Sequence, residues 1–408
     1  MFFIVVLGIV IALNIYVFFK GWQVLPPFFV VKKFYSLLFV SLSLSFVLRM
    51  FYGDAFSPQF SYFLSNVGFT WFVALLYFAL IAAGFDIVSL LNKIFNFYPA
   101  FIKDNILLVR QIIIIASITS VSLLFVYGSY NFNNPDITSY KIELDKPMER
   151  DSLRVVLLSD IHLSSYINGG HLTKYVQMIN SQNPDLVLIA GDIADRDIAP
   201  LYHWDVASVF REIRSEYGVY AITGNHEFYG GVKDELFGYF RESGMELLID
   251  SVAVVAGVQI VGRDDRTNSK RKELKDLIKE TDGSLPIILL DHQPFGLDEA
   301  ARHGVDIQLS GHTHNGQFWP GNLIVKWMYE LSYGYMKKDN THYVVSSGIG
   351  LWGPRLRIGT VSEIVVIDIL PAASGSTAAK AASSEAAETA SAKAASSETA
   401  GPASSTRR

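Results

Sequence analysis

The second half of the chain carries five short polar clusters whose side chains are those that divalent metal ions bind. In chain order they are Asp160-Ile161-His162, Gly191-Asp192, Gly224-Asn225-His226-Glu227, His292 and Gly311-His312-Thr313-His314. They supply carboxylate, amide and imidazole donors, which suit a pair of divalent cations sharing one carboxylate. Two such ions about 3.5–4 Å apart can activate a water and hold a phosphoryl group, so the pattern predicts phosphoryl chemistry.

Each cluster directly follows a short apolar stretch that is typical of a buried strand. The five stretches are residues 153–159, 185–190, 218–223, 285–290 and 306–310. Ligands bind outside the carboxyl ends of strands in α/β sheets, so we expect the five loops to meet at one site. Asp160-x-His162 and His312-x-His314 are each expected on an extended segment, with both donors on one face. Each pair could bind one metal or divide between two.

Together the clusters resemble the signature of the calcineurin-like metallophosphoesterase superfamily, which reads D-x-H, G-D, G-N-H-[D/E], H and G-H-x-H. The resemblance covers about Asp151 to Leu370 and implies an α/β sandwich of two β-sheets flanked by helices. It also implies two groups of metal ligands, the first being Asp160, His162, Asp192 and His314, and the second Asp192, Asn225, His292 and His312. His226 would be a histidine that is not a ligand, contacts the substrate phosphate and protonates the leaving oxygen.

The resemblance implies a metal-dependent phosphoric ester hydrolase with two divalent ions as cofactors. Oxygen and imidazole ligands suit Mn²⁺, Fe²⁺ or Zn²⁺, and Mn²⁺ is expected to serve best in vitro. Asp192 would bridge ions that activate the attacking water, and His226 is the candidate general acid because an imidazole titrates near neutral pH. Asp195 and Glu227 are expected to orient ligand imidazoles. Asn315 stands where glycine is commoner in the family, but asparagine tolerates left-handed backbone geometry.

The first third of the chain predicts a region of four transmembrane helices. Residues 1–19, 34–48, 69–91 and 107–127 are almost uniformly apolar, and each approaches or reaches the roughly 20 residues that span a bilayer. Half of the whole chain is hydrophobic (50%), in agreement with an integral membrane protein. We therefore predict a transmembrane domain at 1–128, a connector at 129–150, a metallophosphoesterase domain at 151–370 and a disordered Ala/Ser-rich tail at 371–408.

Basic residues predict the orientation of these helices. Lys20, Lys32 and Lys33 lie between the first two segments, and Lys93 and Lys103 lie between the last two, whereas the middle loop has only Arg49 at its edge. Because Lys and Arg are enriched on the cytoplasmic side, both termini are expected outside. The charges thus predict a multi-pass membrane protein with its catalytic domain on the outer side. The resemblance of its motifs to a membrane-associated bacterial branch implies that this membrane is the bacterial inner membrane and that the domain is periplasmic.

Composition excludes two classes of site or partner. A formal net charge of −5 without a basic stripe argues against nucleic acid as a partner. The chain contains no cysteine, so it has neither disulfides nor a thiolate metal site.

Arg355 and Arg357 could meet a phosphate, but we expect them on the surface of a late hairpin.

The extended motifs Ser159–Leu163, Gly191–Asp195 and Gly311–Gln317 resemble a membrane-associated bacterial branch of the superfamily. That branch includes envelope phosphoesterases and a hydrolase of UDP-2,3-diacylglucosamine. A site tethered at a bilayer favours an amphiphile, so the expected substrate is a phosphorylated envelope lipid or glycolipid. The alternatives are the UDP-2,3-diacylglucosamine pyrophosphatase reaction of lipid A synthesis and a non-catalytic sensor that binds metal and phosphate.

Overall fold

A computed structural model describes residues 2–52, 55–165 and 167–372 of the chain. The chain divides into two compact units. The first unit comprises the chain up to Asn134 together with Leu351–Val361, and the second comprises Pro135–Gly350 and the chain from Ser362 onward. The Ala/Ser-rich tail predicted at 371–408 lies outside the described residues from position 373 onward.

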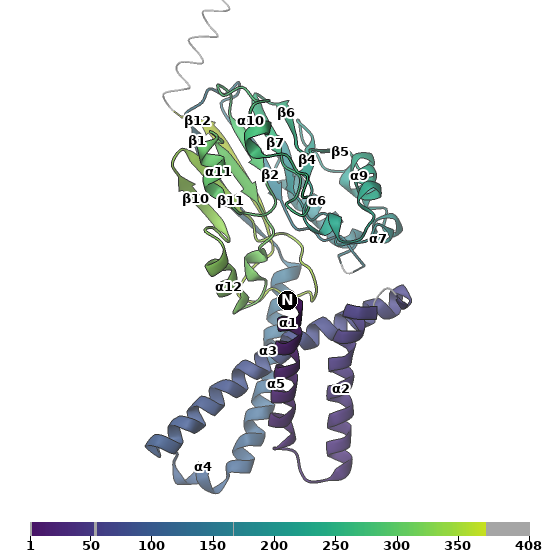
Figure 1. Cartoon of the computed structure of the whole chain (residues 1–408), viewed down its shortest axis with the longest axis vertical. Coiled ribbons are helices and arrows are strands. Elements are labelled where there is room, and N and C mark those ends of the chain that lie inside the picture. Colours follow the sequence, from purple (N-terminus) through teal and green to yellow (C-terminus); the bar gives the residue numbers. More distant parts are fainter. Residues whose placement is uncertain (1, 53–54, 166, 373–408) are drawn as a thin grey trace, which may run out of the picture. The chain divides into compact units, whose positions relative to one another are not determined.

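The first unit is built from long apolar helices, labelled in Figure 1. They are α1 (Phe2–Trp22), α2 (Phe29–Tyr52), α3 (Pro58–Phe95), the short α4 (Ala100–Asp104) and α5 (Ile106–Asn133). Among the described residues, α2, α3 and α5 are long and apolar enough to cross a membrane, whereas α1 offers only the shorter apolar stretch Leu7–Trp22. The structure thus shows three candidate spans among the described residues, and the crossing predicted for the apolar helix α1 stays a prediction.

Helices α2 and α3 approach each other closely at Gly68. A Cβ atom at this position would lie 2.7 Å from the Phe46 Cα, so only a residue without a side chain allows this backbone distance. Nearby, the Ser43 hydroxyl lies 2.6 Å from Asn14 Oδ1 and accepts a hydrogen bond from Trp71 Nε1 at 3.1 Å. These side chains join α1, α2 and α3 through polar contacts inside an otherwise apolar unit.

The segment Leu351–Val361 belongs to the helical unit although it lies late in the sequence. Arg357 N–H donates to the Gly128 carbonyl of α5 at 2.9 Å, and Asn131 Nδ2 donates to the Arg357 carbonyl at 3.1 Å. The Arg357 side chain is fully buried, whereas Arg355 is half-buried and lies 3.4 Å from Tyr62 Oη. The expected surface position is thus wrong for Arg357, because α5 binds its backbone on both sides.

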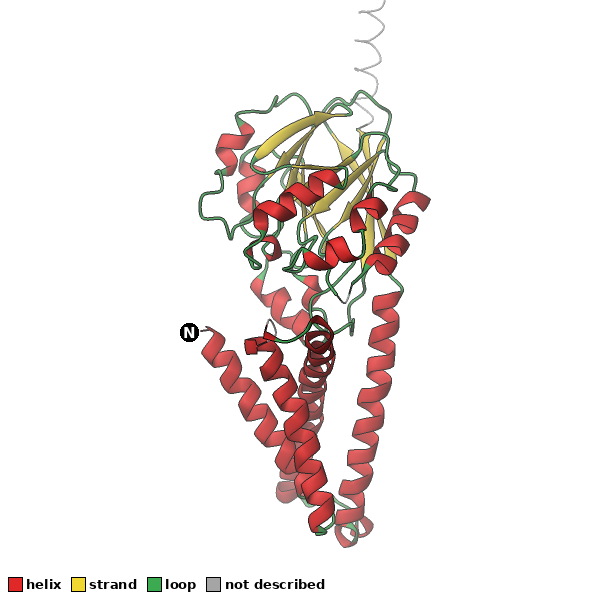
Figure 2. Ribbon diagram, turned by 90° about the vertical axis from the view of Figure 1, so that its right-hand side faces the viewer, coloured by secondary structure: helices red, strands yellow, loops and turns green. Residues whose placement is uncertain are grey.

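The second unit contains two six-stranded sheets, shown in yellow in Figure 2. The first sheet has the order β1 (Asp136–Leu144), β12 (Glu363–Pro371), β2 (Leu153–Leu158), β3 (Leu186–Ala190), β4 (Val219–Ile222) and β5 (Met245–Leu247). Strands β2 to β5 are parallel to one another, and β12 runs antiparallel to β2. Strand β1 lies at the edge of this sheet, within the stretch predicted as a connector.

The second sheet has the order β10 (Gly334–Lys338), β11 (Thr341–Val345), β9 (Ile307–Ser310), β8 (Ile287–Leu290), β7 (Val258–Gly262) and β6 (Ser251–Val255). Strands β7, β8, β9 and β11 are parallel, and the two edge strands are antiparallel to their neighbours. Strands β6 and β7 form a hairpin that turns at Gly257. Alternate residues of both sheets, such as Leu157, Leu188, Ile260 and Ile288, form one buried core between them.

Short helices flank the sheets, which confirms the predicted α/β class. They are α6 (Gly169–Ser181), α7 (Ala199–His203), α8 (Val206–Phe210), α9 (Lys233–Glu242), α10 (Leu274–Ile278), α11 (Leu297–Arg302) and α12 (Gly321–Met328). Helices α7 and α8 are separated at Asp205, which takes a left-handed backbone (φ 42°). Helix α12, which follows the last polar cluster, was not predicted.

We predict that Gly68→Leu lowers the thermal midpoint of the detergent-solubilised protein by several degrees. The new side chain would press on the α2 backbone, and overpacking of this kind costs about 1–3 kcal/mol. Gly84→Leu is the matched control, because it lies on the same helix and a Cβ atom there would have nothing within 4 Å. Equal shifts in the two variants, measured by tryptophan fluorescence on heating, would contradict the close approach.

Candidate metal centre

Five loops carry the side chains predicted to bind metal, and each follows the carboxyl end of a strand that pairs with at least one parallel strand. Asp160 follows β2, Asp192 follows β3, Asn225 follows β4, His292 follows β8 and His312 follows β9. Parallel strands end on the same edge of a sheet, and the two sheets pack face to face. Asp160 and His312 are 152 residues apart in the chain. Their loops, and the three others, therefore meet at one place.

The first group of ligand atoms comes from Asp160, His162 and His314. These atoms lie within 4.8 Å of one another, and all three residues are buried. His162 Nε2 is 3.1 Å from His314 Nε2, which in turn is 3.4 Å from Asp160 Oδ1. Two imidazole nitrogens and a carboxylate oxygen thus converge on one point.

The second group comes from Asp192, His292 and His312, whose ligand atoms also lie within 4.8 Å of one another. His292 Nε2 is 3.1 Å from Asp192 Oδ2 and 3.2 Å from Asn225 Oδ1. Asp192 Oδ2 is also 3.6 Å from His162 Nε2 of the first group. Asp192 therefore lies between the two groups, as a carboxylate shared by two cations must.

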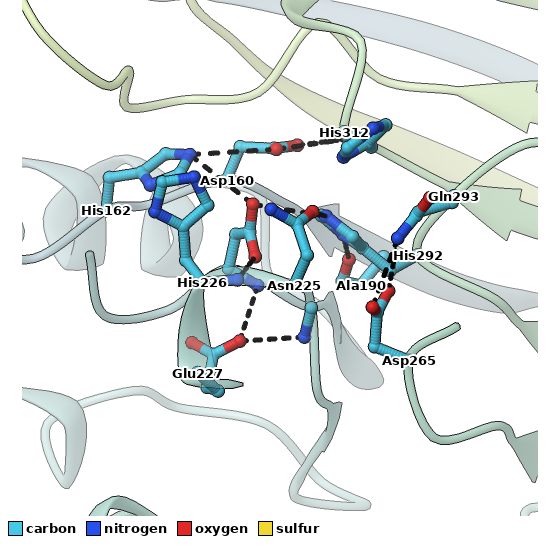
Figure 3. Close-up of polar contacts among 12 residues, drawn as sticks. Asp160, His162, Ala190, Asn225, His226, Glu227, Asp265, His292, Gln293 and His312 are labelled. Atoms are coloured by element: carbon cyan, nitrogen blue, oxygen red, sulfur yellow. Dashed lines mark hydrogen bonds and ion pairs between the residues drawn. The ribbon is translucent and has the colours of Figure 1, made fainter. Parts of the chain in front are cut away.

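The donor chemistry of both groups fits divalent metal ions. His292 Nδ1 lies 2.7 Å from the Ala190 carbonyl, as Figure 3 shows, so Nδ1 carries the proton and the Nε2 lone pair faces the site. The converging atoms are carboxylate, amide and imidazole donors in a buried place, a set that Mn²⁺, Fe²⁺ and Zn²⁺ accept. The residues present thus suit a pair of such ions.

The backbone of these loops differs from the extended geometry expected from the sequence. Asp160, His162, Asp192, His312 and His314 all have positive φ, between 49° and 72°. We predicted that the two donors of D-x-H, and likewise those of H-x-H, would lie on one face of an extended strand. That prediction is therefore wrong. Asp160 and His162 still serve one group, whereas His312 and His314 divide between two. Left-handed residues of this kind are costly unless their surroundings hold them, and they concentrate at functional sites.

Hydrogen bonds and glycines hold the loops in this geometry. Asp160 N–H donates to the Gly191 carbonyl and His162 N–H donates to the Asp192 carbonyl, both at 3.0 Å. A Cβ at Gly224 would lie 2.1 Å from Asp192 Oδ1, and one at Gly311 would lie 2.3 Å from Asp160 Oδ2. The glycines of the G-N-H and G-H-x-H clusters thus leave the space that each buried carboxylate occupies.

Glu227 binds backbone groups and no imidazole, so its predicted role of orienting a ligand imidazole is wrong. Its buried carboxylate accepts hydrogen bonds from the N–H groups of Asp192 (3.2 Å), Ala194 (2.9 Å) and Gly224 (2.7 Å), part of which Figure 3 shows. Burial, followed by the nearby charge of Asp192, raises the pKa of Glu227 to about 8. Glu227 therefore ties the loop after β3 to the loop after β4.

His226 is paired with Asp195 beside the two groups of ligand atoms. Its Nδ1 lies 2.8 Å from Asp195 Oδ1 and 2.9 Å from the Asp195 carbonyl. Burial lowers the pKa of His226, but the hydrogen bond to Asp195 and the charges of Asp192 and Asp195 outweigh it and raise the pKa to about 9. The imidazole thus favours its protonated form. Its Nδ1 is hydrogen-bonded to Asp195, so Nε2 is the nitrogen that can donate a proton to a substrate.

Further buried polar residues lie behind the site and escaped sequence reasoning. Asp265 accepts two hydrogen bonds from Gln293 Nε2, at 3.1 and 2.9 Å, next to His292 (Figure 3). Arg263 Nη1 donates to Asp291 Oδ2 at 3.0 Å. A signal for these residues was present, because Arg263 and Asp265 follow β7, which is parallel to β8. The loop after β7 therefore supports the site in the same way as its neighbours, from the carboxyl end of a parallel strand.

Comparisons with known proteins agree with this geometry. The family model described as calcineurin-like phosphoesterase matches residues 153–316. A metallophosphoesterase of Campylobacter jejuni is 31% identical over 64% of this chain and 71% of its own length. One of Helicobacter pylori is 32% identical over 58% of this chain and 64% of its own. A zebrafish (Danio rerio) transmembrane protein with a metallophosphoesterase domain is 33% identical over 63% of this chain and 62% of its own.

We predict that Glu227→Gln lowers the affinity for Mn²⁺ by about 10–100-fold, the usual cost of losing a partner that supports metal ligands. The amide would place an NH₂ group where backbone N–H donors now point. Glu235→Gln, on the exposed side of α9, is the control. Titration calorimetry measures Mn²⁺ binding, and circular dichroism verifies that each variant folds. Wild-type affinity for Mn²⁺ in both variants would refute this role of Glu227.

Proposed function

The chain belongs to the calcineurin-like metallophosphoesterase family, and on that premise we propose that it hydrolyses a phosphate ester of an envelope lipid or glycolipid at a dinuclear metal site. That it is a metal-dependent phosphoric ester hydrolase follows from the family. The observation that carries the proposal further is the pair of buried ligand groups that share Asp192 in a chain with apolar helices long enough to cross a membrane.

The two groups divide the proposed ligands. Asp160, His162 and His314 would hold one ion, and Asn225, His292 and His312 would hold the other, with Asp192 common to both. Bound divalent ions neutralise phosphoryl oxygens and lower the pKa of a bound water. Of the proposed ligands, Asp160, His162 and His292 are fully buried, so water screens their electrostatic interactions little.

His226 would deliver a proton to the leaving oxygen. Its backbone N–H donates to Asp192 Oδ1 at 2.9 Å, which fixes the residue beside the shared carboxylate. Asp195 holds Nδ1, so the proton available for transfer is the one on Nε2. Because the raised pKa keeps the imidazolium populated at neutral pH, the residue is poised as an acid.

The helical unit is consistent with a membrane-bound substrate, and its basic residues predict on which side of the membrane the catalytic domain lies. Lys32 and Lys33 lie in the first turns of α2, and Lys93 and Lys103 lie between the membrane-crossing parts of α3 and α5. With these residues on the cytoplasmic side of a bacterial inner membrane, α5 exits outward. Whether α1 also crosses changes only the side of the N-terminus, so three spans and four both give a periplasmic catalytic domain.

Activity tests this proposal directly. The full chain in nanodiscs with Mn²⁺ should hydrolyse 4-nitrophenyl phosphate or its bis-ester, and a phosphomonoester lipid such as phosphatidic acid. Asp192→Ala should lose both bound metal and turnover. His226→Gln should keep its metal and lose about 10²–10⁴-fold in kcat with an alkyl leaving group. The loss should be smaller with 4-nitrophenolate, which leaves without a proton.

His171→Ala is the control for these variants, because His171 lies on α6 outside both ligand groups. Metal content by mass spectrometry and turnover should match the wild type. Normal turnover by Asp192→Ala would refute the dinuclear mechanism. A wild-type chain that binds Mn²⁺ and phosphate but turns over none of the esters would favour a non-catalytic sensor.

The side of the membrane that holds the catalytic domain distinguishes hydrolysis of an envelope lipid from the UDP-2,3-diacylglucosamine pyrophosphatase reaction. Val254 is 68% exposed on the edge strand β6, and the chain has no native cysteine, so Val254→Cys places a single thiol on the catalytic unit. We predict that a membrane-impermeant maleimide labels it in intact spheroplasts. Labelling only after lysis would put the domain in the cytoplasm and favour the UDP-2,3-diacylglucosamine pyrophosphatase reaction instead.

A further inference from the structure

Helix α12 of the catalytic unit buries none of its own residues. It covers Gly321–Met328, directly after the cluster that ends at His314. Trp327 is 88% exposed, and Leu323, Ile324 and Met328 are each more than half exposed. Trp319, just before the helix, is also exposed. Single exposed apolar residues are ordinary, but a run of large ones on one short element marks a surface that has a partner.

The spacing of these residues gives the helix one apolar face. Leu323 and Trp327 are four residues apart, as are Ile324 and Met328, so the two pairs stand side by side over adjacent turns. Lys326 flanks this face, and the next carboxylate, that of Glu330, is occupied by Lys338 at 2.7 Å. The face therefore combines a large apolar area and a tryptophan with an adjacent cation.

Both ends of α12 are fastened to the loop that carries the metal histidines. A Cβ at Gly316, two residues after His314, would lie 2.2 Å from the Asn322 backbone nitrogen, so the start of the helix abuts that loop. Beyond its other end, the buried Tyr329 packs with its ring centre 6.4 Å from that of His312. Helix α12 thus lies next to the His312–His314 loop at its start and, through Tyr329, just beyond its end.

We propose that α12 is a membrane-docking helix whose apolar face enters the headgroup region of the bilayer that the chain's own helices cross. The occupant is a lipid surface because the same chain carries α2, α3 and α5, which are long and apolar enough to cross a membrane. Tryptophan prefers the membrane interface, and amphipathic helices lie in it with their apolar face buried about 5–10 Å. Lys326 is placed to meet lipid phosphates.

This inference rests on the proposed function and narrows its substrate. A docked α12 holds the His312–His314 loop at the level of the headgroups. The favoured substrate is then a lipid whose scissile phosphate lies in the headgroup plane and is cleaved without leaving the bilayer. Soluble esters would use the same metal site without any help from α12.

A single fluorescent probe tests the docking without relying on activity. Trp327→Cys in the otherwise cysteine-free full chain is labelled with an NBD fluorophore and placed in nanodiscs of phosphatidylcholine and phosphatidylglycerol. We expect blue-shifted emission, quenching by lipids with a nitroxide near the headgroup, and protection from iodide. Val254→Cys, exposed on the same catalytic unit, should show the reverse: quenching by iodide and none by the lipid nitroxide.

Two results would overturn the docking helix. A Trp327 probe quenched by iodide like the Val254 probe would show a face that stays in water. Protection from iodide without quenching by nitroxide lipids would show that a protein, such as a second copy of the chain, covers the face.

A kinetic ratio tests the consequence for the substrate. In the double variant Ile324→Ser with Trp327→Ser, kcat/KM for phosphatidic acid in nanodiscs, divided by that for 4-nitrophenyl phosphate, should fall about tenfold. An unchanged ratio would contradict the role of α12 in presenting lipid. Absence of hydrolysis by the wild-type chain would count against the proposed function, while the fluorescence result would still decide whether α12 docks.

Discussion

The arrangement of the site depends on one buried carboxylate, that of Asp192. Its side chain meets His292 Nε2 and the backbone N–H of His226, and its backbone N–H and carbonyl bind Glu227 and His162 respectively. The loops after β2, β3, β4 and β8 are thereby joined at a single residue. A buried charge is tolerated only when it is paired and hydrogen-bonded. The contacts that offset the cost of burying Asp192 are thus the same ones that bring the two groups of candidate ligands together.

Two further acidic residues, Asp195 and Glu227, lie near Asp192 and have different roles. Burial alone would raise the pKa of Asp195, but His162, whose Nδ1 lies 3.7 Å away, and the hydrogen bond with His226 outweigh it and hold that pKa below its usual range. Asp195 is therefore ionised and keeps an imidazolium in place. Glu227 lies deeper and accepts its hydrogen bonds from backbone N–H groups, so it acts on loop geometry. The two carboxylates differ in what they do because one faces imidazoles and the other faces amides.

Much of this could be predicted from sequence, for reasons that are physical and local. Apolar runs followed by polar loops indicated strands β2, β3, β4, β8 and β9, and residue types with their spacing indicated the ligand inventory. The left-handed backbone of Asp160 and His162 was not predictable, because a period-of-two pattern assumes an extended chain. Glu227 was misassigned because a sequence does not reveal bonds to backbone groups. Arg357 was misplaced because its burial depends on α5, more than 200 residues earlier in the chain.

The assignment of Leu351–Val361 to the helical unit has a consequence for how the protein can be divided. The chain passes between the two units after Asn134, after Gly350 and after Val361. On either side of the late segment it is anchored in the catalytic unit, since Gly350 N–H donates to the Asp160 carbonyl and Asp136 N–H donates to the Ser362 carbonyl. A cut at residue 134 would therefore not excise an intact enzyme. It would remove α5 from Ile358, which is buried in the full chain and lies against Gly128, in a segment directly after Gly350, which binds the Asp160 carbonyl. Neither the helical anchor nor the enzyme can therefore be exchanged for a foreign counterpart by a simple fusion at one junction.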